Sequence, residues 1–86
     1  MFLEKQYDEA VQEYSVALRL DSHYYPAMNE IGWVCITQYV QSLGLEEPKR
    51  QAALDAWRKS LLINPQQPRI AQLMQTYSQK FSDERP

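Results

Sequence analysis

The sequence predicts an all-α fold of about four antiparallel helices that stack as helical hairpins. Apolar residues recur at helical spacing in four segments of the 86-residue chain. Prolines, which a helix accepts in its first turn but not in its interior, separate these segments at Pro26, Pro48, Pro65 and Pro68. No window alternates apolar and polar residues over a run of β-branched side chains, so a sheet has no support.

The first helix is predicted over residues 7–20. Ala10, Tyr14, Ala17 and Leu18 follow one another at i, i+4, i+7 and i+8, which places them on one face. Acidic residues occupy the first turn, where the helix dipole favours negative charge. These features are typical of an amphipathic helix.

The second helix is predicted over residues 25–43, with Pro26 in its first turn and Gly44 as its C-terminal cap. Its apolar stripe consists of Met28, Ile31, Cys35, Tyr39 and Leu43. The third helix is predicted over residues 48–63, because the residue before Pro65 resists helical geometry.

The fourth helix is predicted to start at Pro68. Its apolar residues at helical spacing are Ile70, Leu73, Met74, Tyr77 and Phe81. We expect one helical domain over residues 1–81, followed by a polar, frayed tail over residues 82–86.

One stretch of the chain occurs twice, because residues 7–22 can be laid over residues 50–65. In this overlay the matched pairs are Ala10 with Ala53, Tyr14 with Trp57, Ala17 with Ser60 and Leu18 with Leu61. A recurring helical unit buries its apolar face by stacking against its neighbours. The repeat therefore predicts a short solenoid, an architecture whose usual role is to hold other chains.

These residues resemble the tetratricopeptide repeat family, whose unit is a helix, a turn and a helix of about 34 residues. The positions that carry the resemblance are Tyr7 to Ala10, Tyr14, Ala17, Leu18, Leu20 and Asp21, then Met28, Ile31, Gly32 and Cys35, then Ala53, Trp57, Ser60 and Pro65. The resemblance covers about residues 1–81. It implies a right-handed solenoid in which the helix from Pro68 acts as a cap.

The chain departs from that family in two places. Ala10 and Ala53 lie 43 residues apart, and we expect the excess between Gly32 and Pro48 to lengthen the second helix by two or more turns. Only residues 1–4 match the first helix of the first unit, so a helix is expected to be missing there. We therefore expect either a piece of a longer array or a homodimer in isolation, in which a second copy covers the open flank.

The composition of the chain indicates which classes of partner it is not expected to bind. The chain has 9 Lys and Arg against 11 Asp and Glu, a net charge of −2, and no basic cluster, which argues against nucleic-acid binding. It carries no apolar run that spans a bilayer and no secretory signal, so we expect a soluble protein without a membrane span. The single cysteine, Cys35, excludes an intramolecular disulfide and is most typical of a reducing compartment such as the cytoplasm.

No set of residues predicts catalysis. Asp21, Ser22 and His23 are neighbours in a turn, whereas a hydrolytic triad is assembled from distant segments. Cys35 has no nearby base, and we interpret it as a small buried hydrophobic residue. We expect no enzymatic activity, no cofactor and no metal.

The resemblance also implies a binding site. The helix predicted over residues 25–43 resembles the first helix of a repeat unit, and in that family the side of this helix away from the main stripe lines a concave peptide-binding groove. The residues placed there are Asn29, Trp33, Ile36 and Thr37, with Arg69 and Gln72 on the last helix. Trp33 is the candidate anchor for a peptide or a partner helix. Alternatively, Trp33 packs against the missing helix, another copy or the end of its own helix. In the alternative interpretation of the last helix, its polar residues form a solvated face. The alternative role of the chain is that of a structural cap or oligomerisation segment of a longer array.

Overall fold

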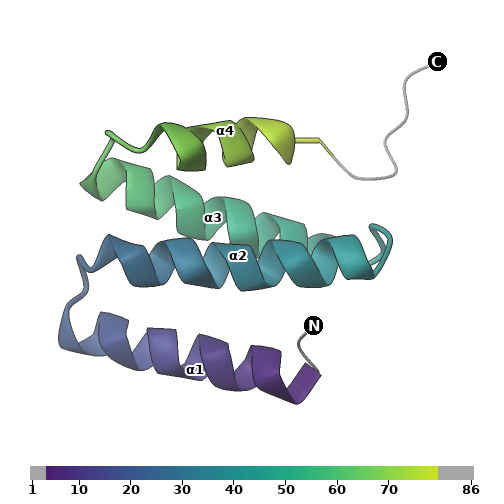
Figure 1. Cartoon of the computed structure of the whole chain (residues 1–86), viewed down its shortest axis with the longest axis horizontal. Helices are drawn as coiled ribbons and strands as arrows, with labels where there is room; N and C mark the ends of the chain where they lie inside the picture. The colour runs from purple at the N-terminus through teal and green to yellow at the C-terminus, as the bar shows by residue number, and fades with distance from the viewer. Residues whose placement is uncertain (1–3, 80–86) are drawn as a thin grey trace.

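Four helices make up the part of the chain that the structure describes, and successive helices run antiparallel (Figure 1). The computed structural model describes residues 4–79. The helices are α1 (Glu4–Leu20), α2 (Tyr25–Gln41), α3 (Glu47–Ile63) and α4 (Pro68–Thr76). No residue in this range belongs to a strand, which confirms the predicted all-α class. None of these helices is long and apolar enough to cross a membrane.

The helices pack in the order of the chain. α2 and α3 form the most extensive pair, α1 lies against α2, and α4 lies against α3. Figure 1 shows α1 and α4 on opposite flanks of this central pair. The loops between helices contain only four or five residues, so each helix folds back on the one before it.

Prolines mark the starts of three helices, as predicted. α2, α3 and α4 each have a proline in the first turn, where the missing N–H leaves no hydrogen bond unmade. The preceding residues Tyr24, Glu46 and Gln67 make no side-chain capping bond. The geometry of proline therefore sets these starts without the usual polar cap. The remaining helix, α1, begins at Glu4, three residues before its predicted start.

α2 ends at Gln41, and the prediction that its apolar stripe continues to Leu43 is wrong. Leu43 has a φ of 57° and is 70% exposed. Gly44 follows with a φ of 83°, and its N–H donates to the carbonyl of Tyr39 at 3.2 Å. This left-handed turn closes the helix and aims Leu43 into solvent. The connection to α3, residues 42–46, holds part of the excess between Gly32 and Pro48. α2 has 17 residues, as do α1 and α3, so it is no longer than its neighbours.

α4 is shorter than its apolar pattern predicted. It ends at Thr76, and Phe81, like the tail 82–86, lies outside the described residues. Arg50 of α3 is buried, and its Nη1 donates to the carbonyl of Tyr77 at 2.8 Å while its Nε and Nη2 pair with Glu47. A charged donor thus satisfies a carbonyl at the end of α4 and ties that end to the start of α3.

The hydrophobic core lies between α2 and α3 and is covered by α4. Its buried members are Cys35, Ile36, Tyr39, Ala53, Leu54 and Trp57, and the partly buried residues packed on it are Ile31, Ile70, Leu73, Met74 and Tyr77. The stripes predicted for α2 and α4, together with the repeat positions Ala53 and Trp57, supply most of this set. α1 contributes less to the core. The residues Ala10, Tyr14 and Ala17 of its predicted apolar face are only half-buried.

Trp57 occupies the closest approach of α2 and α3. Its ring is fully buried, and its indole Nε1 donates to the carbonyl of Asn29 at 3.2 Å. A Cβ added to Gly32 would overlap the indole, with Cδ1 at 2.6 Å and Cε2 at 2.7 Å. The absence of a side chain at Gly32 therefore lets the ring lie directly on the backbone of α2.

Replacing this glycine should destabilise the fold. We expect Gly32→Ala to lower the free energy of unfolding by about 1–3 kcal/mol, because overpacking outweighs the gain in helix propensity. Urea denaturation followed by circular dichroism measures the change. In a Trp57→Leu background the same methyl group should cost less, and equal costs in the two backgrounds would contradict the steric explanation.

Candidate functional site

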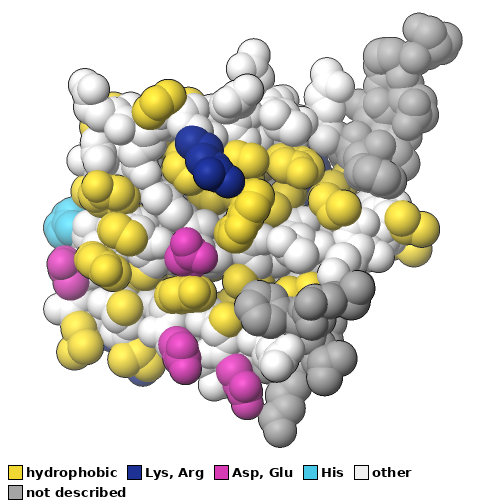
Figure 2. All heavy atoms as spheres, in the orientation of Figure 1, with side chains coloured by type: hydrophobic (Ala, Val, Ile, Leu, Met, Phe, Trp, Pro, Cys, Tyr) yellow, Lys and Arg dark blue, Asp and Glu magenta, His cyan; other side chains and the backbone are white. Residues whose placement is uncertain are grey.

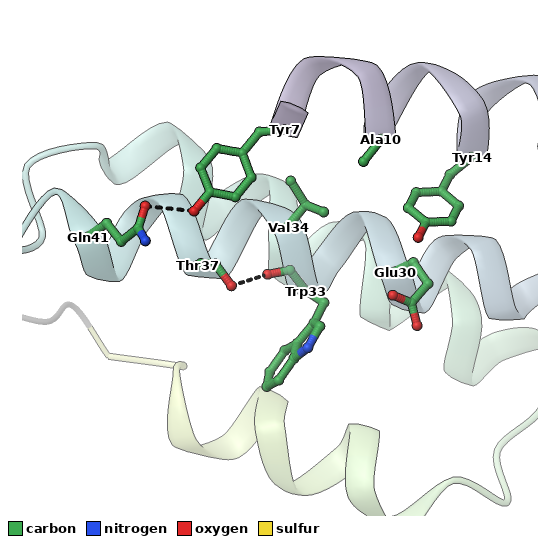
Figure 3. A pocket seen from close by; sticks show the side chains of 8 residues that line it. All are labelled: Tyr7, Ala10, Tyr14, Glu30, Trp33, Val34, Thr37 and Gln41. Atoms are coloured by element: carbon green, nitrogen blue, oxygen red, sulfur yellow. Dashed lines mark hydrogen bonds between the residues drawn. The ribbon is translucent and has the colours of Figure 1, made fainter. Parts of the chain in front are cut away.

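The largest described hollow lies between α1 and α2 and has a volume of about 490 Å³ (Figure 3). We call it the α1–α2 groove. Its lining residues are Tyr7, Ala10, Tyr14, Glu30, Trp33, Val34, Thr37 and Gln41. Most of these side chains present carbon atoms, so the groove offers an apolar surface with a few polar groups.

Helical periodicity brings the lining residues together. On α1, Tyr7, Ala10 and Tyr14 follow at i, i+3 and i+7. The α2 residues run from Glu30 to Gln41 with spacings of three and four. Each set therefore forms one stripe on its helix, and the antiparallel packing of α1 on α2 places the two stripes side by side.

Hydrogen bonds within the protein hold the groove at the end nearest the α2–α3 turn. The hydroxyl of Tyr7 donates to Oε1 of Gln41 at 2.7 Å, joining α1 to α2 (Figure 3). Thr37 Oγ1 donates to the carbonyl of Trp33 at 2.7 Å. Tyr7 is also almost fully buried. Both bonds use the hydroxyl protons of their donors, and the Tyr7 bond joins the two walls at this end of the groove.

The opposite end of the groove is acidic. Figure 3 shows the Tyr14 ring pointing from α1 toward Glu30 on α2. Partial burial of the ring, followed by the negative charges of Glu30 and Glu13, raises the pKa of Tyr14 above its ordinary value. No described residue forms an ion pair with Glu30. This end of the groove therefore presents a carboxylate that has no ion pair with a described residue, although Arg69 lines the neighbouring hollow together with Glu30.

Trp33 forms the wall between the groove and a second hollow. Its ring projects from α2 on the side toward α4, and the residue is 43% exposed. The Arg69 guanidinium carbon lies 6.0 Å from the ring centroid, within the range of a cation–π contact. Hydrophobic side chains gather over α2 and between α2 and α4 on this face (Figure 2). Trp33 and Val40 are the large hydrophobic residues of α2 that are exposed, at 43% and 36%, among the described residues.

The second hollow, of about 310 Å³, lies between α2 and α4. Asn29 lines it, and its Nδ2 donates to Oε1 of Gln67 at 2.8 Å. The Nε2 of Gln67 donates to Ser60 Oγ at 2.9 Å and to the Asn64 carbonyl at 2.8 Å, which fixes the orientation of the Gln67 amide. Asn29 Oδ1 is then left buried without a partner among the described atoms. The Asn29 amide is committed to this network more than to an open surface.

The predicted site residues fall into two groups. Trp33 and Thr37 line the groove, and Arg69 joins Trp33 across the second hollow. Ile36 lines a smaller hollow of about 180 Å³ together with Trp33 and Thr37, but it is only 2% exposed and belongs to the core, so it offers a ligand almost no surface. Gln72 is exposed on α4 but lines none of the described hollows. The direction of each side chain around its helix decides these differences.

Six residues that line the groove are outside the site predicted from the sequence: Tyr7, Ala10, Tyr14, Glu30, Val34 and Gln41. Tyr7 and Val34 are almost fully buried, so they offer a ligand little surface. The resemblance gives Tyr14 a packing position in the repeat and places Tyr7 at the start of a helix. A usable signal was present, because the stripe through Glu30, Trp33 and Thr37 has helical spacing. It does not by itself say which neighbour the stripe faces.

The side chains of reactive type outside the groove, His23 and Cys35, lie in surroundings that do not indicate a reactive site. His23 lies in an exposed turn where its backbone N–H donates to Asp21 Oδ1 at 3.0 Å. Cys35 is buried, and burial raises the pKa of its thiol although Lys49 opposes the shift. Among the described residues no group of three or more His, Cys, Asp or Glu side chains is placed to hold a metal ion.

The acidic end of the groove yields a titration prediction. Glu30→Gln removes a negative charge that disfavours the phenolate, so the pKa of Tyr14 should fall while the contribution from burial remains. A pH titration of the tyrosine Cζ resonances by NMR, with Tyr14→Phe for assignment, measures this value. Glu13→Gln should produce a smaller decrease. An unchanged pKa in Glu30→Gln would show that the two side chains do not interact.

Comparison of the chain with protein-family models, with curated proteins and with solved structures finds no significant match. The resemblance to the tetratricopeptide repeat family therefore remains an expectation from the sequence.

Proposed function

We propose that this chain is a protein–protein interaction module that holds a peptide or a partner helix against the face of α2 that carries Trp33. The observation that carries the proposal is the half-exposed indole between two hollows. A monomer gains nothing from exposing so large an apolar ring, whereas an interface gains both its area and its polar N–H.

The surroundings of Trp33 match those of an interface anchor. Tryptophan and arginine are the residues most enriched among binding hot spots, and Arg69 lies over the Trp33 ring. Ile36 fills the core behind Trp33 on the same helix, which restricts the movement of α2. A ligand therefore meets a surface whose shape is set before binding, which lowers the entropy lost on association.

The resemblance to a family of binding repeats supports the same proposal. The groove-lining side of α2 is the side that the resemblance assigns to peptide binding, and Trp33 and Thr37 lie on it. The function would need neither a cofactor nor a catalytic group.

A second candidate function is self-association or the capping of a longer array. It is favoured by a difference between the two copies of the repeated stretch. Ala53, Trp57 and Ser60 are fully buried, whereas the matched residues of α1 are only half-buried. A second copy that covers α1 would remove this difference.

Light scattering distinguishes the two candidates. Self-association through the groove requires a mass of twice 10.2 kDa at micromolar concentration. It also requires that Thr37→Lys, which places a charged side chain in the groove, returns the mass to that of one chain. Thr76→Lys on the exposed side of α4 serves as the matched control. A mass of one chain for the wild type would exclude self-association under these conditions.

Partner binding should depend on the indole of Trp33. Partners can be selected from a display library of natural protein fragments. We expect Trp33→Ala to lower the affinity for these partners by about 30-fold, or about 2 kcal/mol. Leu62, on α3, is 79% exposed and lines none of the described hollows, so Leu62→Ala should change the affinity by less than about threefold. Titration calorimetry measures both effects, and circular dichroism checks that the helices are kept. Equal losses in the two variants would remove Trp33 from the binding site.

A further inference from the structure

We propose that the α1–α2 groove seats one amphipathic helix of a separate partner protein, which places a small residue against Tyr14 and a lysine or arginine opposite Glu30. The inference rests on the proposed function and specifies the chemistry of the partner. It is carried by the backbone of the groove walls, by the internal repeat and by the charge at one end of the groove.

The walls of the groove favour a helix over an extended peptide. Both walls are α-helices, whose backbone N–H and C=O groups bond within each helix. An extended peptide would bury its own backbone groups against such walls without partners, at a cost for each group. The hydroxyl protons of Tyr7 and Thr37 are already donated within the protein. A helix satisfies its own backbone and needs only an apolar stripe to fill the groove.

The internal repeat indicates how such a helix packs on α1. In the second copy of the repeat, α2 lies on α3 and buries Trp57 completely against Gly32. Tyr14 matches Trp57 in the repeat, yet it lies half-buried on the groove. A helix placed on α1 as α2 is placed on α3 would bring a glycine or an alanine against Tyr14. The described chain supplies no such helix to α1.

Charge complementarity selects a basic residue on the partner. Glu30 lies at the edge of an apolar groove and has no ion pair with a described residue. Glu13 adds negative charge beside Tyr14. Covering this end with an uncharged helix would remove water from a carboxylate without compensation. A lysine or arginine in that position restores the pairing.

The described helices of a second copy fit the groove poorly. α1 is acidic, with Asp8, Glu9 and Glu13 against Arg19 among its described side chains, and would meet Glu30 with like charge. α2 has Glu30 as its only charged residue, so it offers no cation to the groove. The apolar residues of α4 already pack on the core. The exposed face of α3 carries basic residues, but Leu62 is its only large exposed apolar side chain within the described range. A separate protein is therefore the better source of the helix.

A charge-reversal selection tests the inference. The display library of natural protein fragments is selected in parallel against the wild type, Glu30→Lys and the control Glu46→Lys, whose change lies in the exposed α2–α3 loop. The leading fragments are synthesised as peptides, and their affinities and bound helicity are measured by titration calorimetry and circular dichroism. Each is also made with its basic residue changed to glutamate.

We expect the wild type and Glu46→Lys to enrich fragments with apolar residues at i, i+3 or i+4 and i+7, a glycine or alanine within that stripe, and a lysine or arginine beside it. These peptides should become helical on binding. Changing the basic residue to glutamate should weaken binding to the wild type by about fivefold and strengthen binding to Glu30→Lys by a similar factor.

Other outcomes overturn the inference in distinguishable ways. Fragments that bind without helicity and still depend on Trp33 would refute the helical partner and leave the proposed function intact. Fragments indifferent to Trp33→Ala and to Thr37→Lys, or a failure to enrich any fragment, would refute both. A doubled mass that Thr37→Lys abolishes would identify a second copy as the occupant. If the change of the basic residue to glutamate does not strengthen binding to Glu30→Lys, the pairing with Glu30 is refuted.

Discussion

The contact between Trp57 and the backbone of α2 at Gly32 sets the geometry on which the rest of the structure depends. The indole fills the space that a side chain at position 32 would need, and its N–H is satisfied by the Asn29 carbonyl. Tyr77, just after α4, lies against the same ring, with the centroids 6.4 Å apart. Trp57 of α3 therefore sets both the distance between α2 and α3 and the position of α4. Because the interior is close-packed, a shift at this contact would move both neighbours.

The same constraint makes α2 suited to present a binding surface. Cys35, Ile36 and Tyr39 hold one side of the helix in the core, whereas Trp33 and Thr37 lie on the other side. A side chain that projects from a helix anchored in this way has few alternative positions. Its orientation is set by folding, so the proposed binding would need no rearrangement of this side chain.

The two copies of the repeated stretch differ in how completely they are covered. Trp57 lies against α2 and Tyr77, and Ser60 accepts a hydrogen bond from Gln67 in the loop before α4. Among the described helices α1 packs mainly on α2, and its matched residues are only half-buried. A chain of 86 residues buries a modest fraction of its surface, so uncovered apolar positions weigh heavily in its stability. A partner that binds only the folded state stabilises it by mass action, which links occupancy of the groove to the stability of the whole fold.

The sequence by itself determined the helices, because spacing and proline are local signals: it predicted four helices, three starts at prolines, and most of the core on α2 to α4. Only the tertiary structure decided that Ile36 lies in the core, that Leu43 leaves the helix and that Arg69, but not Gln72, reaches Trp33. These outcomes depend on how neighbouring helices are placed around one another. Adjacent positions on a helix differ in direction by about 100°, so a residue near the edge of an apolar stripe becomes core or groove according to which helix lies beside it.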